Sequence, residues 1–273
     1  MKKLFAAIAA FALAATVASA QDFNAAVDAF NAGAQALETN KTEALAHFRT
    51  ALTEALACEG EEAADLVAKC KEIIPGTLLS IAKEKINEGS YDDALVTLEE
   101  VKTVAAEYEA AEAAAEAENL IPNALMRKGT TLLKAKELDG AIEALTRAYD
   151  LGEEKAGKLL STAYLQKGNA LRAAGKNAEA IEALEKSNSY AESANAYKLI
   201  ASVYTKSGKS AQAIDAYKKY LELEPNAKDA ADIMFTIAAT AQKAGDKATA
   251  KEYYKKLAGT KYAAQAEAQL KTL

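Results

Sequence analysis

The sequence predicts an all-α fold in which short antiparallel helix pairs stack on one another. Three features of the 273-residue chain indicate this class: it has only three prolines, it has no tryptophan, and it is rich in alanine, the strongest helix former. A pattern of two short helices around a glycine turn also recurs along the chain. Repetition of this kind identifies a fold before any local detail does.

The first element is a signal peptide, predicted over residues 1–20. It has a basic start (MKK), an apolar run over residues 4–17, and a small-x-small cleavage site (ASA) before Gln21. The alternative is an uncleaved membrane anchor, although the apolar run falls short of the ~20 residues that a spanning helix needs. Residue 21 is not cysteine, so no lipoprotein anchor is indicated. We therefore expect a soluble, exported mature chain.

The clearest helix pair lies at residues 163–187, with the sequence AYLQKGNALRAAGKNAEAIEALEKS. Its first helix is expected to end at Gly175, since glycine readily adopts the left-handed conformation that ends helices. Asn177 is suited to cap the second helix, whose apolar residues again have helical spacing. Small residues at Gly168 and Ala180 would let the two backbones approach closely. Because neither helix can bury its apolar face alone, we expect the pair to pack against copies of itself.

The same template recurs on both sides of this pair. Alanine is the commonest residue, so the informative signal is the joint match of a turn glycine, small residues and large apolar residues at fixed offsets. The other copies contain the following residues: Ala32, Ala44, Phe48 and Ala51; Leu78, Ala82, Gly89, Ala94, Leu98 and Val101; Leu125, Gly129, Leu132, Ala141, Leu145 and Ala148; Tyr197, Ala201, Tyr204, Gly208, Ala213, Tyr217 and Tyr220; and Met234, Ala238, Ala241, Gly245, Ala250, Tyr254 and Leu257.

This pattern resembles the tetratricopeptide repeat (TPR) family. In that family helix A carries a small residue, helix B carries an alanine followed by an aromatic residue or leucine, and a proline closes the repeat, as Glu224-Pro225 does here. The resemblance covers most of residues 22–259. It implies a TPR-like α-solenoid over residues 21–273, with about six helical hairpins that are clearest at 122–259. With the signal peptide, it suggests an exported bacterial member of the family.

The first half of the chain departs from the family's spacing. Successive helix-B alanines are 50, 47, 39, 33 and 37 residues apart, against 34 in the family. Pro75 and Pro122 are each expected to begin a helix A, preceded by added helices at 61–74 and 103–121. The second added segment has strong helix propensity but only a thin apolar stripe, so a long solvated helix and a disordered linker both stay open. Residues 261–273 fit no repeat and are expected to cap the last hairpin.

The only two cysteines are Cys58 and Cys70. Two cysteines this close in an exported protein suggest a disulfide. However, a helix that starts just after Cys58 would carry Cys70 about three turns away from it, which is too far for a bridge. A disulfide and two buried thiols therefore both remain possible from the sequence.

The charge of the chain argues against polyanionic partners. The formal net charge of −6 would become −8 once the signal peptide and its two lysines are removed. An acidic chain without a clustered run of Lys and Arg gains no counterion-release affinity for nucleic acid. Anionic membrane surfaces are not expected partners for the same reason.

Two features that could carry chemistry are better explained by structure. Gly208-Lys209-Ser210 imitates the end of a phosphate-binding loop, but Val203 replaces the leading glycine and no strand precedes it. His47 is the only histidine, and nothing near it in the sequence suggests a catalytic arrangement. With one histidine and two cysteines a zinc site would need several carboxylate ligands. We therefore expect neither an enzyme, nor a metal site, nor a cofactor.

The resemblance to TPR proteins implies a concave surface lined by the A helices, which in that family usually binds an extended peptide or a helix. Asn169 matches one residue of the carboxylate clamp of TPR co-chaperones, but Leu165 replaces the accompanying lysine, so that clamp is not supported. Arg172 and Lys198 would contact an acidic segment or a C-terminal carboxylate, with Leu165 as the apolar anchor. The alternative is that these residues only pack against neighbouring helices. The groove positions transferred by register are Met126, Thr130, Leu133, Thr162, Leu165, Asn169, Arg172, Asn195, Lys198, Ser202, Thr205, Phe235 and Gln242.

The sequence thus favours a non-enzymatic, exported scaffold that binds a protein or peptide in the bacterial cell envelope. The periplasm is the expected compartment, with secretion as the alternative. A structural protein that assembles with itself is the competing hypothesis. The sequence names neither the partner nor the oligomeric state.

Overall fold

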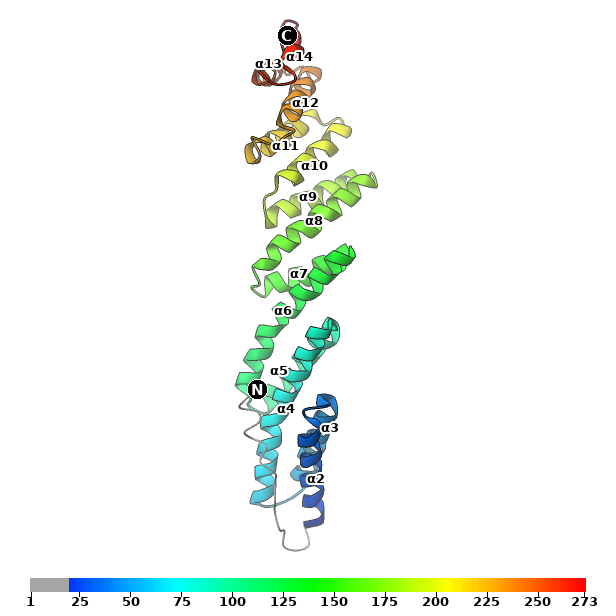
Figure 1. The fold of residues 1–273 in the computed structure, drawn as a ribbon, viewed down its shortest axis with the longest axis vertical. Helices are drawn as coiled ribbons and strands as arrows, with labels where there is room; N and C mark the ends of the chain where they lie inside the picture. The colour runs from blue at the N-terminus through cyan, green and yellow to red at the C-terminus, as the bar shows by residue number, and fades with distance from the viewer. Residues whose placement is uncertain (1–19) are drawn as a thin grey trace. The chain divides into compact units, whose positions relative to one another are not determined.

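The computed structural model describes residues 20–273, and side chains from Phe23 onward (Figure 1). The predicted signal peptide lies outside the described residues except for Ala20. This part of the chain contains thirteen α-helices and no strand, so the predicted all-α class is confirmed. The helices are α2 (Ala20–Ala36), α3 (Lys41–Leu56), α4 (Glu61–Glu88), α5 (Tyr91–Glu107), α6 (Ala111–Ala135), α7 (Leu138–Asp150), α8 (Lys155–Ala173), α9 (Asn177–Tyr190), α10 (Ala194–Lys206), α11 (Ser210–Leu223), α12 (Ala230–Lys243), α13 (Lys247–Lys256) and α14 (Ala263–Leu270).

The helices divide between two compact units whose boundary lies inside α6, between Lys128 and Gly129. The first unit holds α2 to α5, most of α6 and residues 150–153, and the second holds the rest of the chain. Within each unit, consecutive helices pack side by side in antiparallel pairs (Figure 1). The predicted architecture of stacked helix pairs is therefore present.

The helices of a pair cross where the sequence places its small residues. A Cβ atom added to Gly168 of α8 would lie 2.6 Å from Leu184 Cγ and 3.1 Å from Ala180 O, both on α9. Gly129 stands in the same relation to Leu145 and Ala141 O across the α6–α7 crossing. The small residue of helix A thus faces the alanine and the large residue of helix B, as the repeat template predicts.

The first hairpin follows the same rule with a shift of one residue. There the close contact is made by Gly33, whose added Cβ would lie 2.8 Å from the Phe48 ring and 3.2 Å from Ala44 O. The residue assigned to this role from the sequence, Ala32, is half-buried. That assignment was wrong by one position, because alanine and glycine are adjacent in the sequence and both are small.

Most of the turns use a left-handed residue five positions before the helix-B alanine. Gly175 and Gly208 have φ angles of 77° and 71° at this position, a conformation that costs glycine little. The third hairpin has Lys136 at the same place, with φ of 64°. For a residue with a Cβ atom the left-handed conformation costs about 1 kcal/mol or more. The conformation at Gly208 also confirms that Gly208-Lys209-Ser210 is a helix turn.

The long first-half repeats are built differently from the prediction. Pro75 and Pro122 do not begin helices; they lie inside α4 and α6, which are continuous over 28 and 25 residues. The segment predicted as an added helix at 61–74 is therefore the first half of α4. The segment 103–121 is split, because its start belongs to α5 and its end to α6.

Burial explains why α4 continues through its proline. Leu66, Cys70, Ile74, Leu78 and Ala82 follow each other at intervals of four residues, and each is at most 1% exposed. A break at the proline would have put one half of this apolar stripe out of phase with the other. Burial of several large side chains, at about 1.5–3 kcal/mol each, outweighs a helix-interior proline at about 3 kcal/mol.

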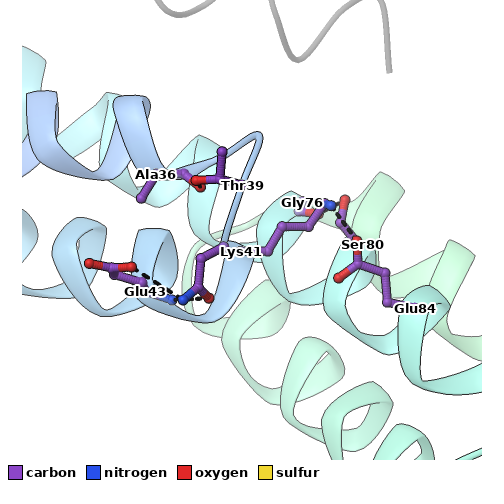
Figure 2. A network of polar contacts seen from close by, with 8 residues as sticks. Ala36, Thr39, Lys41, Glu43, Gly76, Ser80 and Glu84 are labelled. Carbon is purple, nitrogen blue, oxygen red and sulfur yellow. Dashed lines mark hydrogen bonds and ion pairs between the residues drawn. The ribbon is translucent and has the colours of Figure 1, made fainter. Parts of the chain in front are cut away.

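Side-chain hydroxyls supply extra donors near this proline. Thr77 Oγ1 donates to Ile73 O at 2.9 Å. Ser80 Oγ donates to Gly76 O at 3.0 Å (Figure 2). Bonds of this type to the carbonyl four residues earlier are common where helices bend. They add donors to a turn in which Pro75 itself can donate none.

A capped helix start fastens α3 to α4 (Figure 2). Asn40 is the N-cap of α3, and its side chain accepts a hydrogen bond from Glu43 N at 3.2 Å. Lys41, the first residue of α3, forms an ion pair with Glu84 of α4. The first turn of α3 is thus held both by its own cap and by the neighbouring helix.

The C-terminal segment forms the predicted capping helix. α14 follows α13 and packs against it, with Ala266 only 2% exposed. The Tyr262 ring stacks on Phe235 of α12 with 4.6 Å between centroids, and Gln242 Nε2 donates to Gln269 Oε1 at 3.0 Å. The last hairpin is therefore covered on the side where a further repeat would pack.

Candidate partner-binding surface

Eight of the predicted groove residues lie on two packed A helices of the second unit, and five of them make up the candidate face. Leu165, Asn169 and Arg172 are on α8, and Lys198 and Ser202 are on α10, which contacts α8. Asn169 is exposed, and the other four are half-buried. We call these five residues the α8–α10 face.

Two of the polar groups on this face are engaged with one another. Arg172 donates from Nη2 to Asn169 Oδ1 at 2.9 Å and from Nε to the same oxygen at 3.3 Å. Because the amide is neutral, this contact orients the guanidinium without neutralising it. The Arg172 charge is thus presented in a fixed direction, with its positive field intact.

Lys198 is held more tightly than the sequence suggests. Its ammonium forms an ion pair with Asp229, the residue before α12, and lies 5.4 Å from the centroid of the Tyr220 ring. Tyr220 OH donates to Asp229 Oδ1 at 2.5 Å. The hydrogen bond from Lys198 and then that from Tyr220 lower the pKa of Asp229. Burial, followed by the bond to Asp229, raises the pKa of Tyr220 to about 12. This triad joins α10, α11 and α12, so Lys198 is first of all a structural residue.

Several of the remaining groove candidates are less available to a ligand. Leu133 is buried in a cluster with Ala141 and Ala163. Phe235 packs between Tyr254 and Tyr262, and Gln242 bonds to Tyr254 and Gln269. Met126 and Thr130 on α6 are half-buried and lie on opposite sides of the boundary between the units. Thr162, Asn195 and Thr205 are exposed or donate within their own helices: Thr162 to Lys158 O and Thr205 to Ala201 O.

The structure also has a pocket that the sequence did not indicate. It has a volume of about 570 Å³ and lies among α9, α10 and α11, with Tyr197, Ile200 and Tyr204 of α10 on its wall. Lys218 and Glu222 of α11 are among its charged residues. Tyr197 and Tyr204 fit the repeat template as core positions, so their spacing gave no reason to place them in a cavity.

Asn188 of α9 also lines this pocket. Its Oδ1 accepts a hydrogen bond from Ser193 N at 2.9 Å, whereas its Nδ2 is buried without a partner among the described residues. Tyr197 OH donates to Glu192 at 3.0 Å. The pocket thus combines aromatic walls with a mixed set of charges and an unused amide donor.

The two cysteines are not bridged in the structure. Cys58 Sγ donates to Glu54 O at 3.3 Å at the end of α3, and Cys70 is fully buried in α4. Burial raises the pKa of the Cys70 thiol to about 12. Of the two possibilities left open by the sequence, the structure thus has two free thiols and no disulfide. The reason is that Cys70 lies in the third turn of α4, where its side chain is buried in the core.

His47 lies on α3, where its Nε2 is 3.9 Å from Glu43 Oε1, one turn earlier. Among residues 20–273 no group of three or more His, Cys, Asp or Glu side chains is arranged to hold a metal ion. None of the helices in this range has the length and apolar character needed to cross a bilayer.

Comparison with protein families identifies two repeats in the second unit. Residues 161–193 and 194–227 match the family model of the tetratricopeptide repeat. These segments contain most of α8 and all of α9, α10 and α11, the hairpins that carry both the α8–α10 face and the pocket. None of the curated proteins compared with the chain matches it significantly.

Comparison with solved structures of other proteins gives further similarities. The chain is similar to MamA, at 23% identity over 67% of this chain and 90% of that one, with a TM-score of 0.34. It is also similar to MamA of Desulfovibrio magneticus RS-1 (21%, 67% and 92%, TM-score 0.33) and to PilF of Pseudomonas aeruginosa (17%, 91% and 99%, TM-score 0.35). Likeness at this level carries no argument about function. The matched segments, with the close crossing at Gly168 inside the first of them, identify residues 161–193 and 194–227 as tetratricopeptide repeats.

Proposed function

We propose that this chain is an exported, non-enzymatic scaffold that binds an extended segment of a partner protein on the α8–α10 face. The supporting observation is that Leu165 and Arg172 lie seven positions apart on α8, and so on one face of a helix that packs against α10. The equivalent positions on α12 are covered by the C-terminal cap. TPR proteins are generally interaction scaffolds, and A helices usually line their binding surface.

The chemistry of the face favours an acidic segment with one apolar side chain. Arg172 keeps its charge, since its partner is the neutral amide of Asn169. Leu165 is half-buried against the core of the second unit and offers a fixed apolar contact. Ser202 adds a hydroxyl on the adjacent helix. Most of the affinity should come from Leu165, since exposed ion pairs contribute only ~0.2–1 kcal/mol each.

Binding can be tested with a photo-crosslinking amino acid placed at Ser202 in the native host, followed by mass spectrometry of the crosslinked partner. The same probe at exposed Val96 of the first unit, 70% exposed, is the control for non-specific capture. The purified partner should then lose at least about tenfold in affinity for Leu165→Ala/Arg172→Ala. Unchanged affinity would exclude the α8–α10 face.

Lys198 needs a separate variant because it also holds Asp229. Lys198→Ala would leave that carboxylate without its cation, so reduced binding could reflect a shifted α12. A matched control is Asp229→Asn, which disturbs the same triad and leaves Lys198 in place. If both variants weaken binding equally, Lys198 acts through the structure and does not contact the partner.

Export to the periplasm is the second part of the proposal. It is supported by the basic start, apolar run and small-x-small site of residues 1–20. Cell fractionation with N-terminal sequencing should find a periplasmic chain that begins at Gln21. A chain recovered from the cytoplasm with its first twenty residues intact would refute export, and recovery from the medium would indicate secretion.

A further inference from the structure

Acidic and basic residues are divided unevenly along the chain. Residues 20–128 contain 21 acidic and 9 basic residues, whereas residues 129–273 contain 18 acidic and 22 basic residues. The change falls at the boundary between the two compact units. The total charge of −6 therefore conceals an acidic first part and a basic second part.

The basic character of the second part is concentrated on α13. Lys247, Lys251 and Lys255 follow at intervals of four residues, so they line one face of this helix over about 12 Å. All three are exposed, and within residues 23–273 none has a carboxylate at ion-pair distance. By contrast Lys256, on the neighbouring face, pairs with Glu252 at 2.7 Å. We call the three unpaired residues the lysine row.

Helix stability does not explain the lysine row. Lys255 lies in the last turn of α13, where a cation favours the helix, but Lys247 is the first residue of α13. A cation there opposes the helix dipole. Three like charges one turn apart also repel each other. Such a row is more easily explained by a negatively charged surface that it meets.

The first unit presents such a surface where α3 connects to α4. Glu59, Glu61, Glu62 and Asp65 are all exposed, and residues 50–68 contain no lysine or arginine. In the part of the chain that the structure describes, none of the four forms an ion pair. The first turn of α4 accounts for Glu61 and Glu62, since anions there favour the helix, but not for the other two. We call these four residues the acidic corner.

An apolar side chain stands next to the acidic corner. Leu56, the last residue of α3, is 62% exposed. Contacts between exposed charges alone contribute little, so a stable contact needs apolar area as well. The hydrocarbon stems of three lysines in a row can cover a leucine while their ammonium groups reach carboxylates around it.

We propose that two copies of this chain bind one another by seating the acidic corner of one copy on the lysine row of the other. Every copy carries both surfaces, so the complement is always present at the concentration of the chain itself. A contact between two different patches is heterologous, and it generates either rings or open chains of copies. The proposal is independent of the α8–α10 face.

The test measures the mass of the purified full chain in solution by light scattering and sedimentation velocity. Charged contacts between exposed groups are screened by salt, so the association constant should fall about tenfold or more between about 50 mM and about 500 mM NaCl. Two charge reversals address the surfaces directly. One is Lys247→Glu/Lys251→Glu/Lys255→Glu, and the other is Glu59→Lys/Glu62→Lys/Asp65→Lys.

Each reversal alone should give single chains at low salt, because the acidic corner and the lysine row of every copy then carry charges of the same sign. An equimolar mixture of the two variants should associate again, since the reversed corner of one meets the reversed row of the other. The matched control is Lys155→Glu/Lys158→Glu/Lys228→Glu, which makes the same change of charge at exposed lysines elsewhere in the second unit and should associate like the wild type. Thermal melts by circular dichroism establish that each variant is folded.

Three results would overturn the proposal. The first is a wild-type chain that remains single at low salt, which would leave the lysine row to an anionic partner of another kind. The second is a mixture of the two reversed variants that fails to associate although both are folded. The third is an equal loss of association in the control, which would show that total charge and not the two surfaces is responsible.

Discussion

The crossing at Gly168 allows a quantitative test of the fold. In Gly168→Ala the added Cβ would lie 2.6 and 2.8 Å from Leu184 Cγ and Cδ2 and 3.1 Å from Ala180 O. The leucine can turn away, but the backbone oxygen cannot move without shifting α9. Overpacking of this kind costs roughly 1–3 kcal/mol, whereas replacing a helix-interior glycine with alanine gains about 1 kcal/mol. The difference between these figures is a net loss of about 0–2 kcal/mol, and we expect about 1 kcal/mol.

Other hairpins explain why the loss should be small. Three of them have alanine at the equivalent position of helix A and a leucine or tyrosine opposite, so a slightly wider crossing is compatible with the fold. These alanines are Ala82, Ala201 and Ala238, all fully buried. Gly168→Leu should cost more, about 3 kcal/mol, because no hairpin of this chain places a branched side chain there.

Urea denaturation followed by circular dichroism measures these losses. The control is Gly140→Ala on α7, whose Cβ would meet only the Leu132 Cδ1 atom, at 3.2 Å. That variant should be as stable as the wild type or more stable. Leu184→Ala alone should cost about 2–5 kcal/mol, and the double variant Gly168→Ala/Leu184→Ala should cost less than the sum, since each change relieves the other.

The reasoning fails if Gly168→Ala is stabilised as much as Gly140→Ala. It also fails if the losses of Gly168→Ala and Leu184→Ala simply add, because the two residues would then not be in contact. Either result would mean that α8 and α9 cross elsewhere and that the register of this repeat is wrong.

Three further predictions concern single residues. Lys136→Gly should stabilise the chain by about 1 kcal/mol in urea denaturation, since it relieves a left-handed lysine, whereas Lys134→Gly in α6 should destabilise it by about 1 kcal/mol. Cys70 should resist thiol reagents at pH 8 until the chain unfolds. Burial raises the pKa of its thiol from 9.0 to about 12. The stability that the protonated thiol contributes is therefore complete below pH 9 and is lost as the pH rises toward 12. Tyr220→Phe should lower the free energy of unfolding by about 1 kcal/mol and raise the pKa of Asp229 in NMR titration. Because the pKa of Asp229 is lowered in the folded chain, the stability that this carboxylate contributes is lost as the pH falls through that pKa.

The sequence predicts this fold well wherever side-chain size determines the contact. Gly168 and Ala180 were predicted to let the two backbones approach closely, and they do, with Leu184 as the third residue of the crossing. The prediction for the prolines was wrong because two effects disagree at Pro75. The local preference of proline is to begin a helix, whereas burial of the apolar stripe favours a helix that continues through it. The apolar stripe of α4 runs through that residue without a change of phase, and this signal was present in the sequence.

The candidate site could be predicted only in part. The register of the repeats placed Leu165 and Arg172 of α8 on one face with Lys198 of α10, and α8 and α10 are in contact in the structure. It could not show that Asp229 takes up Lys198, because that ion pair joins residues 31 positions apart across two hairpins. Nor could the register show the pocket beside Tyr197 and Tyr204, because a pocket forms where the side chains of neighbouring helices leave space unfilled, and spacing in the sequence does not reveal this.

The length of α4 has a consequence for how the first unit opens. Its 28 residues span about 42 Å, while its partner α5 has only 17. One helix therefore packs against α3 as well as α5 and also contacts α2. In an ordinary repeat array each hairpin contacts only its neighbours, so it can unfold locally with the loss of those contacts alone. Here the single helix α4 belongs to two hairpins, because it packs against both α3 and α5. The amide hydrogens of α2 to α5 should therefore exchange with solvent as one cooperative unit, whereas those of the second unit should exchange hairpin by hairpin.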